Sequence, residues 1–137
     1  MTLKHLCLWL MLSMTISVHS FAKETAYRLS TFIKPSFQQI TLKVDPDSPA
    51  FSGETAITID VTKATDTIGF YQKGLNIQKA YLTNGNTNIP LTVTSHDYEI
   101  QHGKASQNIA VDRYTLHIVF DGKFNTSSDG MYLSKFE

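Results

Sequence analysis

The stretch Tyr114-Thr115-Leu116-His117-Ile118-Val119-Phe120 decides the fold class of this chain. From Tyr114 to Phe120, every second side chain is aliphatic or aromatic, so these four share one face of an extended backbone. His117 alternates out of phase with its neighbours and therefore points to the opposite face. Asp121-Gly122 then supplies a turn signal. The stretch predicts a strand with one buried face.

The same period of two appears upstream. Ile40, Leu42 and Val44 alternate with Thr41 and Lys43 and predict a half-buried strand. A second strand is predicted from its apolar positions Ile57, Ile59 and Val61. The two are expected to form a hairpin, because the segment between them is the turn cluster Asp45-Pro46-Asp47-Ser48-Pro49.

Further short strands are predicted at residues 67–70, 75–82 and 89–94. Asn84-Gly85-Asn86 joins the last two as a hairpin turn, because Asn and Gly tolerate positive φ. Apolar pieces at 98–100 and 109–111 flank Gly103, and another strand-like segment begins at Met131. No window shows a sustained apolar stripe of period 3.6. The expected fold is all-β, an antiparallel sandwich or saddle-like sheet that forms an incomplete domain.

The first 22 residues have the pattern of a targeting segment. Lys4 and His5 precede an apolar region from Leu6 to Val18, and Ser20-Phe21-Ala22 places small residues where a signal peptidase cuts. Residues 1–22 are therefore expected to be a signal peptide and 23–137 the exported domain, periplasmic or extracellular. The alternative is an uncleaved membrane anchor, but the apolar stretch is short for a hydrocarbon core of roughly 30 Å.

Composition excludes several functions. Cleavage after residue 22 removes the only cysteine, Cys7, so the mature chain has no disulfide, thiol nucleophile or cysteine zinc ligand. It also removes Lys4, which leaves 11 Lys and Arg against 12 Asp and Glu, dispersed along the chain. No basic patch is available to neutralise several phosphates, so a nucleic-acid partner is not expected.

The residues that carry chemistry do not form a recognisable catalytic set. His96 and His102 are expected in or beside turns. We interpret these two and His117 as surface histidines. The alternative is weak metal binding by His96, Asp97 and His102. Asp45 and Asp47 are interpreted as turn caps and not as a calcium loop, because Ca²⁺ needs about six to eight oxygen ligands. Three further candidates are weak. Ser127 and Ser128 lack a nucleophile elbow, and Gly130 belongs to no phosphate loop. Asn125-Thr126-Ser127 is a glycosylation sequon, which is relevant only in a eukaryote.

The aromatic residues are interpreted mainly as core, with a ligand groove as the alternative. Most stand in phase with aliphatic positions of the predicted strands. They are Phe70, Tyr71, Tyr81, Tyr98, Tyr114, Phe120, Phe124, Tyr132 and Phe136. Tyr71 and Tyr81 are the exceptions, and a surface that packs against a following domain is the other interpretation for these two.

Several motifs, in order and spacing, resemble the N-terminal β domain of the aminopeptidase N family of zinc metallopeptidases. They are Tyr27-Arg28-Leu29, Lys34-Pro35-Ser36-Phe37, Phe51-Ser52-Gly53-Glu54, Asp66-Thr67-Ile68, Lys73-Gly74-Leu75-Asn76-Ile77 and Gly130-Met131-Tyr132-Leu133-Ser134-Lys135-Phe136. The chain departs from the family at Phe37, where a tyrosine is common. At Gly53, a bulge or a close backbone approach is the expected physical reason for glycine.

The resemblance implies a role in proteolysis without a site in this chain. Members of the family remove N-terminal residues from peptides with a His-Glu-x-x-His zinc motif and a Gly-x-Met-Glu-Asn stretch, and neither occurs in the sequence. No catalytic, substrate-binding or metal residue is therefore assigned, and no cofactor is expected in this chain, whereas zinc is expected in the full-length enzyme. The expected partner is a catalytic zinc-peptidase domain, downstream in the same parent chain or encoded separately, with peptides as its substrate.

Two alternatives remain open. The first is a complete, non-enzymatic exported β module that binds a protein or a carbohydrate. The second is a gene-model break or natural truncation, with the catalytic portion encoded immediately downstream. As a piece of an aminopeptidase, the chain alone is expected to be inactive.

Overall fold

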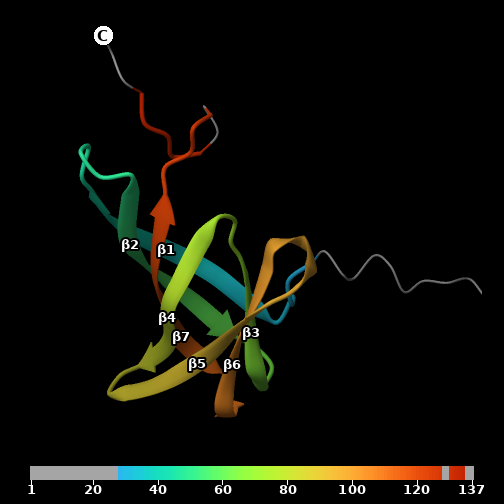
Figure 1. Ribbon diagram of the computed structural model, residues 1–137. Helices are drawn as coiled ribbons and strands as arrows, with labels where there is room; N and C mark the ends of the chain where they lie inside the picture. The colour runs from blue at the N-terminus through green and yellow to red at the C-terminus, as the bar shows by residue number, and fades with distance from the viewer. Residues whose placement is uncertain (1–27, 128–129, 135–137) are drawn as a thin grey trace, which may run out of the picture.

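A computed structural model describes residues 28–127 and 130–134. The signal peptide predicted at 1–22 lies outside the described residues, as does Phe136. The strands are β1 (Ile33–Val44), β2 (Ala50–Val61), β3 (Thr65–Tyr71), β4 (Leu75–Asn84), β5 (Thr87–Ser95), β6 (Ile100–Ile109) and β7 (Asp112–Lys123), with one short 3₁₀ turn, η1 (Asp97–Glu99), before β6 (Figure 1). Within the described part of the chain, no helix is long and apolar enough to cross a membrane.

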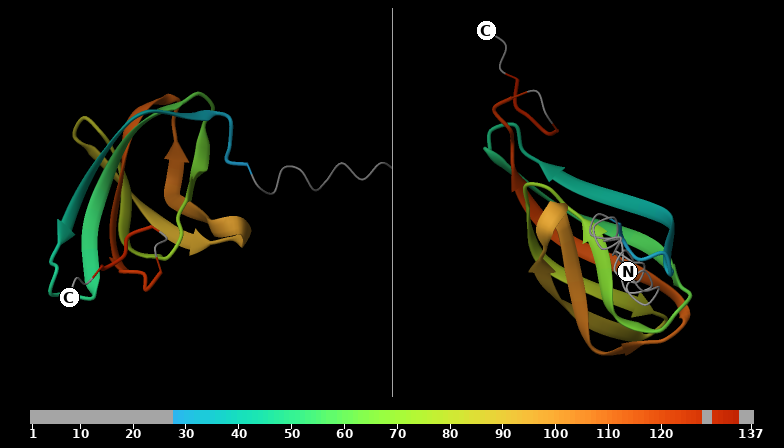
Figure 2. Two further views of the ribbon diagram at one scale, coloured as in Figure 1. Left: turned by 90° about the horizontal axis from the view of Figure 1, so that it is seen from above. Right: turned by 90° about the vertical axis from the view of Figure 1, so that its right-hand side faces the viewer.

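All seven strands belong to one antiparallel sheet. Their order is β1-β2-β7-β4-β5-β6-β3, so β1 and β3 are the outer strands and β7 lies between β2 and β4. Figure 2 shows that the sheet curls strongly into a half-barrel. The all-β, antiparallel, saddle-like prediction is therefore confirmed.

The concave face of the half-barrel holds the core. Cross-strand pairing places Ile57 of β2 opposite Leu116 of β7, and Leu116 opposite Leu82 of β4, so one row of apolar side chains runs across the three strands. The members of the core cluster are Phe51, Ile59, Val61, Ile68, Phe70, Ala80, Leu82, Ile89, Leu91, Ala105, Ile109, Tyr114, Leu116, Ile118 and Phe120. The buried face predicted for residues 114–120 is confirmed.

Two glycines leave room for aromatic rings on this concave face. A Cβ at Gly122 would stand 2.6 Å from Phe51 Cζ, and a Cβ at Gly53 would stand 2.7 Å from the backbone oxygen of Thr41 and 3.0 Å from Phe120 Cζ. Real Cβ atoms do not approach other atoms so closely, so a larger residue would displace the rings. The close approach predicted at Gly53 is confirmed.

The predicted turns also form. Ser48 N–H donates to Asp45 O at 3.1 Å, and Asp47 N–H donates to Asp45 Oδ1 at 3.0 Å, which is the turn-capping role predicted for Asp45. Gly85, between β4 and β5, has a φ of 54°, the left-handed conformation that a tight hairpin requires.

Four expectations about the strands and aromatics are wrong or incomplete. The strand containing Ile40 and Val44 exists, but it is exposed and not half-buried, because it is the outer strand and no described segment covers it. Tyr98 and Tyr132 are exposed instead of core. Met131 begins no strand, since the described residues there form only an isolated bridge between Asn125 and Tyr132. β6 runs unbroken through residues that alternation did not reveal, because its middle is polar.

Candidate binding surface on the concave face

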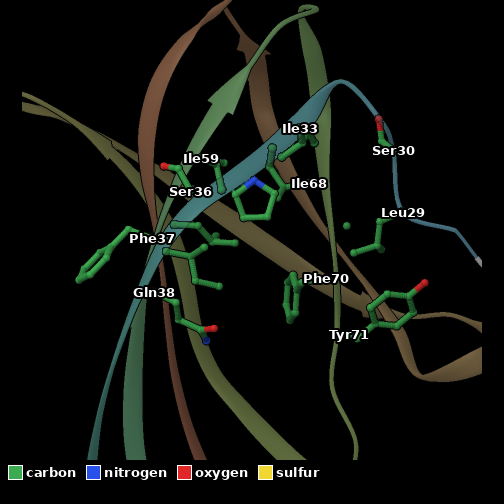
Figure 3. A pocket seen from close by; sticks show the side chains of 14 residues that line it. Leu29, Ser30, Ile33, Ser36, Phe37, Gln38, Ile59, Ile68, Phe70 and Tyr71 are labelled. Carbon is green, nitrogen blue, oxygen red and sulfur yellow. The ribbon is translucent and has the colours of Figure 1, made fainter.

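Two hollows lie where the outer strands of the half-barrel approach each other. The edge pocket is a cavity of about 480 Å³ between β1 and β3, open on one side (Figure 3). Side chains from both strands line it, and its apolar lining includes Leu29, Ile33, Ile59, Ile68 and Phe70. Figure 3 shows the Phe37 ring pointing away from the pocket, in keeping with its pairing opposite Thr58 on the convex side.

Few polar groups interrupt the apolar lining of the edge pocket. Gln38 Nε2 donates to Thr55 Oγ1 at 3.0 Å, and Thr55 Oγ1 donates to Gln39 O at 3.1 Å, so these groups satisfy one another. Ser30 Oγ is buried and has no hydrogen-bond partner among the described residues.

The apolar surface continues along β1 beyond the pocket. We call Ile40, Leu42 and Val44 the β1 strip; their exposed fractions are 56%, 45% and 51%. The strip lies on the core side of the sheet, because Leu42 pairs opposite Gly53 and Val44 opposite Phe51. It therefore extends the core face to the free edge of β1, where nothing described covers it.

The hairpin between β5 and β6 brings two of the predicted surface histidines together. His96 and His102 have ring centroids 4.1 Å apart, beside a second hollow of about 480 Å³ whose lining includes Arg28, Asp97 and Tyr98. The loop that joins the strands is unusual, since both Tyr98 and Glu99 have positive φ. Burial lowers the pKa of His102, and the charge of His96 lowers it further.

These histidines do not form a catalytic metal centre. Nowhere among residues 28–127 and 130–134 do three or more His, Cys, Asp or Glu side chains gather closely enough to hold a metal ion. A hydrolytic zinc site needs three convergent protein ligands and an open position for water. The described residues therefore do not fit a catalytic zinc ion, and no step of catalysis is assigned to them.

The remaining candidate residues have structural surroundings. His117 stacks on Tyr81 with centroids 4.7 Å apart and lies 3.1 Å from Thr83 Oγ1, on the face opposite the core as predicted. Tyr81 is half-buried there, with Lys79 Nζ 4.7 Å from its ring centroid. Ser127 is exposed, whereas Ser128 lies outside the described residues.

The histidine pair makes the stability of the chain sensitive to mild acid. Because the pKa of His102 is lowered in the folded state, its contribution is fully present above the unfolded value of about 6.5 and is lost as pH falls through the folded pKa. We expect the melting temperature to decrease below about pH 6.5, and His102→Gln to reduce that decrease. Thermal denaturation followed by circular dichroism, from about one pH unit above the unfolded pKa to about 1.5 units below it, measures the decrease.

The matched control for this experiment is His117→Gln, on the opposite part of the sheet. His117 stacks on Tyr81 and not on the histidine pair, so this substitution leaves the contact between His96 and His102 in place. If His102→Gln and His117→Gln changed the profile equally, the coupling between His96 and His102 would not be its cause.

Comparison with known families identifies the chain. The family model described as the Peptidase M1 N-terminal domain matches residues 34–137, which is well over half of the sequence. The chain therefore belongs to the Peptidase M1 N-terminal domain family, and the resemblance inferred from its motifs is confirmed. No curated protein matches the chain. M1 peptidases are in general zinc-dependent, and in parent enzymes a catalytic peptidase domain follows this one.

Proposed function

We propose that this chain is the N-terminal architectural domain of an exported zinc aminopeptidase, which removes N-terminal residues from peptides. The observation that carries the proposal is the family match over residues 34–137. The signal peptide read from residues 1–22 supports export to the periplasm or the extracellular space. The chain itself is inactive, and its sheet supplies a wall against which the peptidase domain packs.

The exposed apolar surface supports the architectural role. An exposed apolar patch that continues the core is a sign of an interaction surface. Here the β1 strip and the edge pocket lie side by side on the core face of β1. Such a face suits a permanent partner more than a transient one, because obligate interfaces resemble a domain core divided in two.

The size of the native product tests this function. An antibody raised against the chain would probe the envelope and secreted fractions of the source organism. We expect a band several times larger than the 15.4 kDa of the full sequence. Material captured by the antibody should release the amino acid from an amino-acid p-nitroanilide, a zinc chelator should abolish this activity, and added Zn²⁺ should restore it.

The rival function is a stand-alone exported β module. A captured band near the mass of this chain, with no chelator-sensitive aminopeptidase beside it, would favour that rival and refute the proposed function. A mock capture with pre-immune antibody controls for peptidases that bind nonspecifically.

A further inference from the structure

Two histidines stand side by side where β5 turns into β6. Thr94 of β5 pairs opposite His102 of β6. His96, two residues beyond Thr94, therefore lies diagonally across from His102 on the same face of the hairpin. The two ring centroids are 4.1 Å apart, and the rings are tilted by 38°. His96 is exposed and His102 is half-buried, so a small ligand can reach both rings from solvent.

Neither imidazole is committed to another side chain. Among the described residues, no hydrogen bond or ion pair involves the ring nitrogens of His96 or His102, and their one ring contact is with each other. His117 differs, because its Nε2 lies 3.1 Å from Thr83 Oγ1. Burial lowers the pKa of His102, and the charge of His96 lowers it further. The neutral form, which carries a lone pair for a metal ion, is favoured in this way.

The separation of the rings suits a chelate. In a tetrahedral site with metal–nitrogen bonds of about 2.0–2.1 Å, two coordinating nitrogens lie roughly 3.3 Å apart. Rings whose centroids are 4.1 Å apart can bring one nitrogen each to that separation by small rotations about their side-chain bonds. Gly69 lies opposite His102 on the next strand, β3, so no side chain at that position hinders the rotation.

The second hollow, which holds about 480 Å³ beside the pair, has room for the water molecules that would complete the coordination of an ion. Thr65, Thr67 and Asp97 supply polar groups to its lining. Asp97 does not complete a three-ligand group with the histidines, but a carboxylate in the same hollow favours a cation. Arg28 also lines the hollow and is the group that would favour an anion instead.

The ligand type selects the class of metal. Imidazole nitrogen suits Zn²⁺, Cu²⁺ and Ni²⁺, whereas Ca²⁺ and Mg²⁺ take oxygen ligands. Two protein ligands leave the other positions of the ion to water. Such a site is weaker than a closed structural site with four protein ligands, and it lacks the three protein ligands of a catalytic zinc centre.

We propose that His96 and His102 chelate a divalent transition-metal ion, which fastens the end of β5 to the start of β6. The turn between the two ligands contains Tyr98 and Glu99, whose φ values are 61° and 64°. A left-handed backbone at two successive residues other than glycine is strained, and the bound ion holds this turn closed. The inference does not rest on the proposed function, because it concerns only the β5–β6 hairpin.

Nickel binding to the full chain tests the site. The chain is stripped of metal with a chelator, and Ni²⁺ is titrated into it by isothermal calorimetry at about one pH unit above the ordinary histidine pKa. His96→Gln and His102→Gln each remove one ligand, and His117→Gln is the matched control on another part of the sheet. Every variant keeps the same first 22 residues, so any ligands there contribute equally to each titration. Circular dichroism shows beforehand that each variant retains its β structure.

We expect His96→Gln and His102→Gln each to bind Ni²⁺ at least about tenfold more weakly than the wild type, because a chelate loses the gain from its second ligand. His117→Gln should bind like the wild type. Ni²⁺ should also raise the melting temperature of the wild type and of His117→Gln, since an ion that binds only the folded state stabilises it. Mg²⁺ at the same concentration should leave the melting temperature unchanged.

Three results would overturn the proposal. The first is equal Ni²⁺ affinity in the wild type and every variant. The second is a nickel-dependent rise in melting temperature that survives the loss of His96 or His102. The third is a rise produced by inorganic phosphate and not by Ni²⁺, which would make the hollow an anion site beside Arg28.

Discussion

Leu82→Ala is expected to destabilise the fold by about 2–5 kcal/mol, because it removes a side chain with no solvent exposure from the middle of the sheet. Leu82 pairs opposite Ile89 of β5 and Leu116 of β7, so the cavity would open between strands whose backbones are fixed on both sides. A domain of this size has a total stability of only about 5–15 kcal/mol. Urea denaturation measured by circular dichroism gives the change in the free energy of unfolding.

The control for this substitution is Val111→Ala, which removes apolar volume from a side chain that is 61% exposed. Its effect should stay within about 0.5 kcal/mol of zero. If Leu82→Ala were as mild as Val111→Ala, the concave face of the half-barrel would not be the core of the protein.

Gly122→Val is the substitution with the second largest expected effect. A Cβ at this position would already lie 2.6 Å from Phe51 Cζ and 3.0 Å from Leu75 Cδ2, and valine adds two more methyl groups. The Phe51 ring has little room to move, since it is buried and lies against Phe124. We expect a loss of about 1–3 kcal/mol or more, seen as a lower midpoint in urea.

Lys123→Val provides the comparison at the next position of β7, where the side chain is exposed. Valine suits a strand, so this variant should retain wild-type stability. A Gly122→Val protein that melted together with Lys123→Val would show that the Phe51 ring does not rest on Gly122.

The alternation of apolar residues predicted most of the strands, but it could not predict which faces are covered. Apolar side chains alternate in the same way in residues 114–120 and in Ile40 to Val44. Those of the first stretch are buried, whereas those of the second are exposed. The alternation of apolar residues predicts which side chains share a face of a strand. Whether another layer covers that face depends on the strand order, which places β7 in the interior of the sheet and β1 at its edge.

β6 escaped prediction for a related reason. Its central residues are mostly polar or small, and Gly103 packs against Leu91, where a Cβ would come within 3.1 Å of Leu91 Cδ1. The strand is held by its neighbours β5 and β3 on both sides. Local sequence carries little of that information, because β propensity depends strongly on the surrounding sheet.

The candidate site was predictable only in its parts. The sequence places His96 and His102 near turns, but their contact requires the β5–β6 hairpin to close with Thr94 opposite His102. The edge pocket was not predictable, because Ile33 and Ile68 belong to strands at opposite ends of the sheet order that the curl of the half-barrel brings together. The family could be recognised because its motifs lie along the chain and need no spatial assembly.

The central position of β7 governs the order in which the protein can be assembled. Among the strands that the structure describes, β7 is the last in the sequence, yet it alone joins the β1–β2 hairpin to the four strands β4, β5, β6 and β3. Contacts between segments so distant in sequence form slowly, because the loop between them must first be closed. During synthesis, the β1–β2 hairpin therefore cannot be joined to the other four strands until residues 112–123 have emerged. The complete core can form only after that.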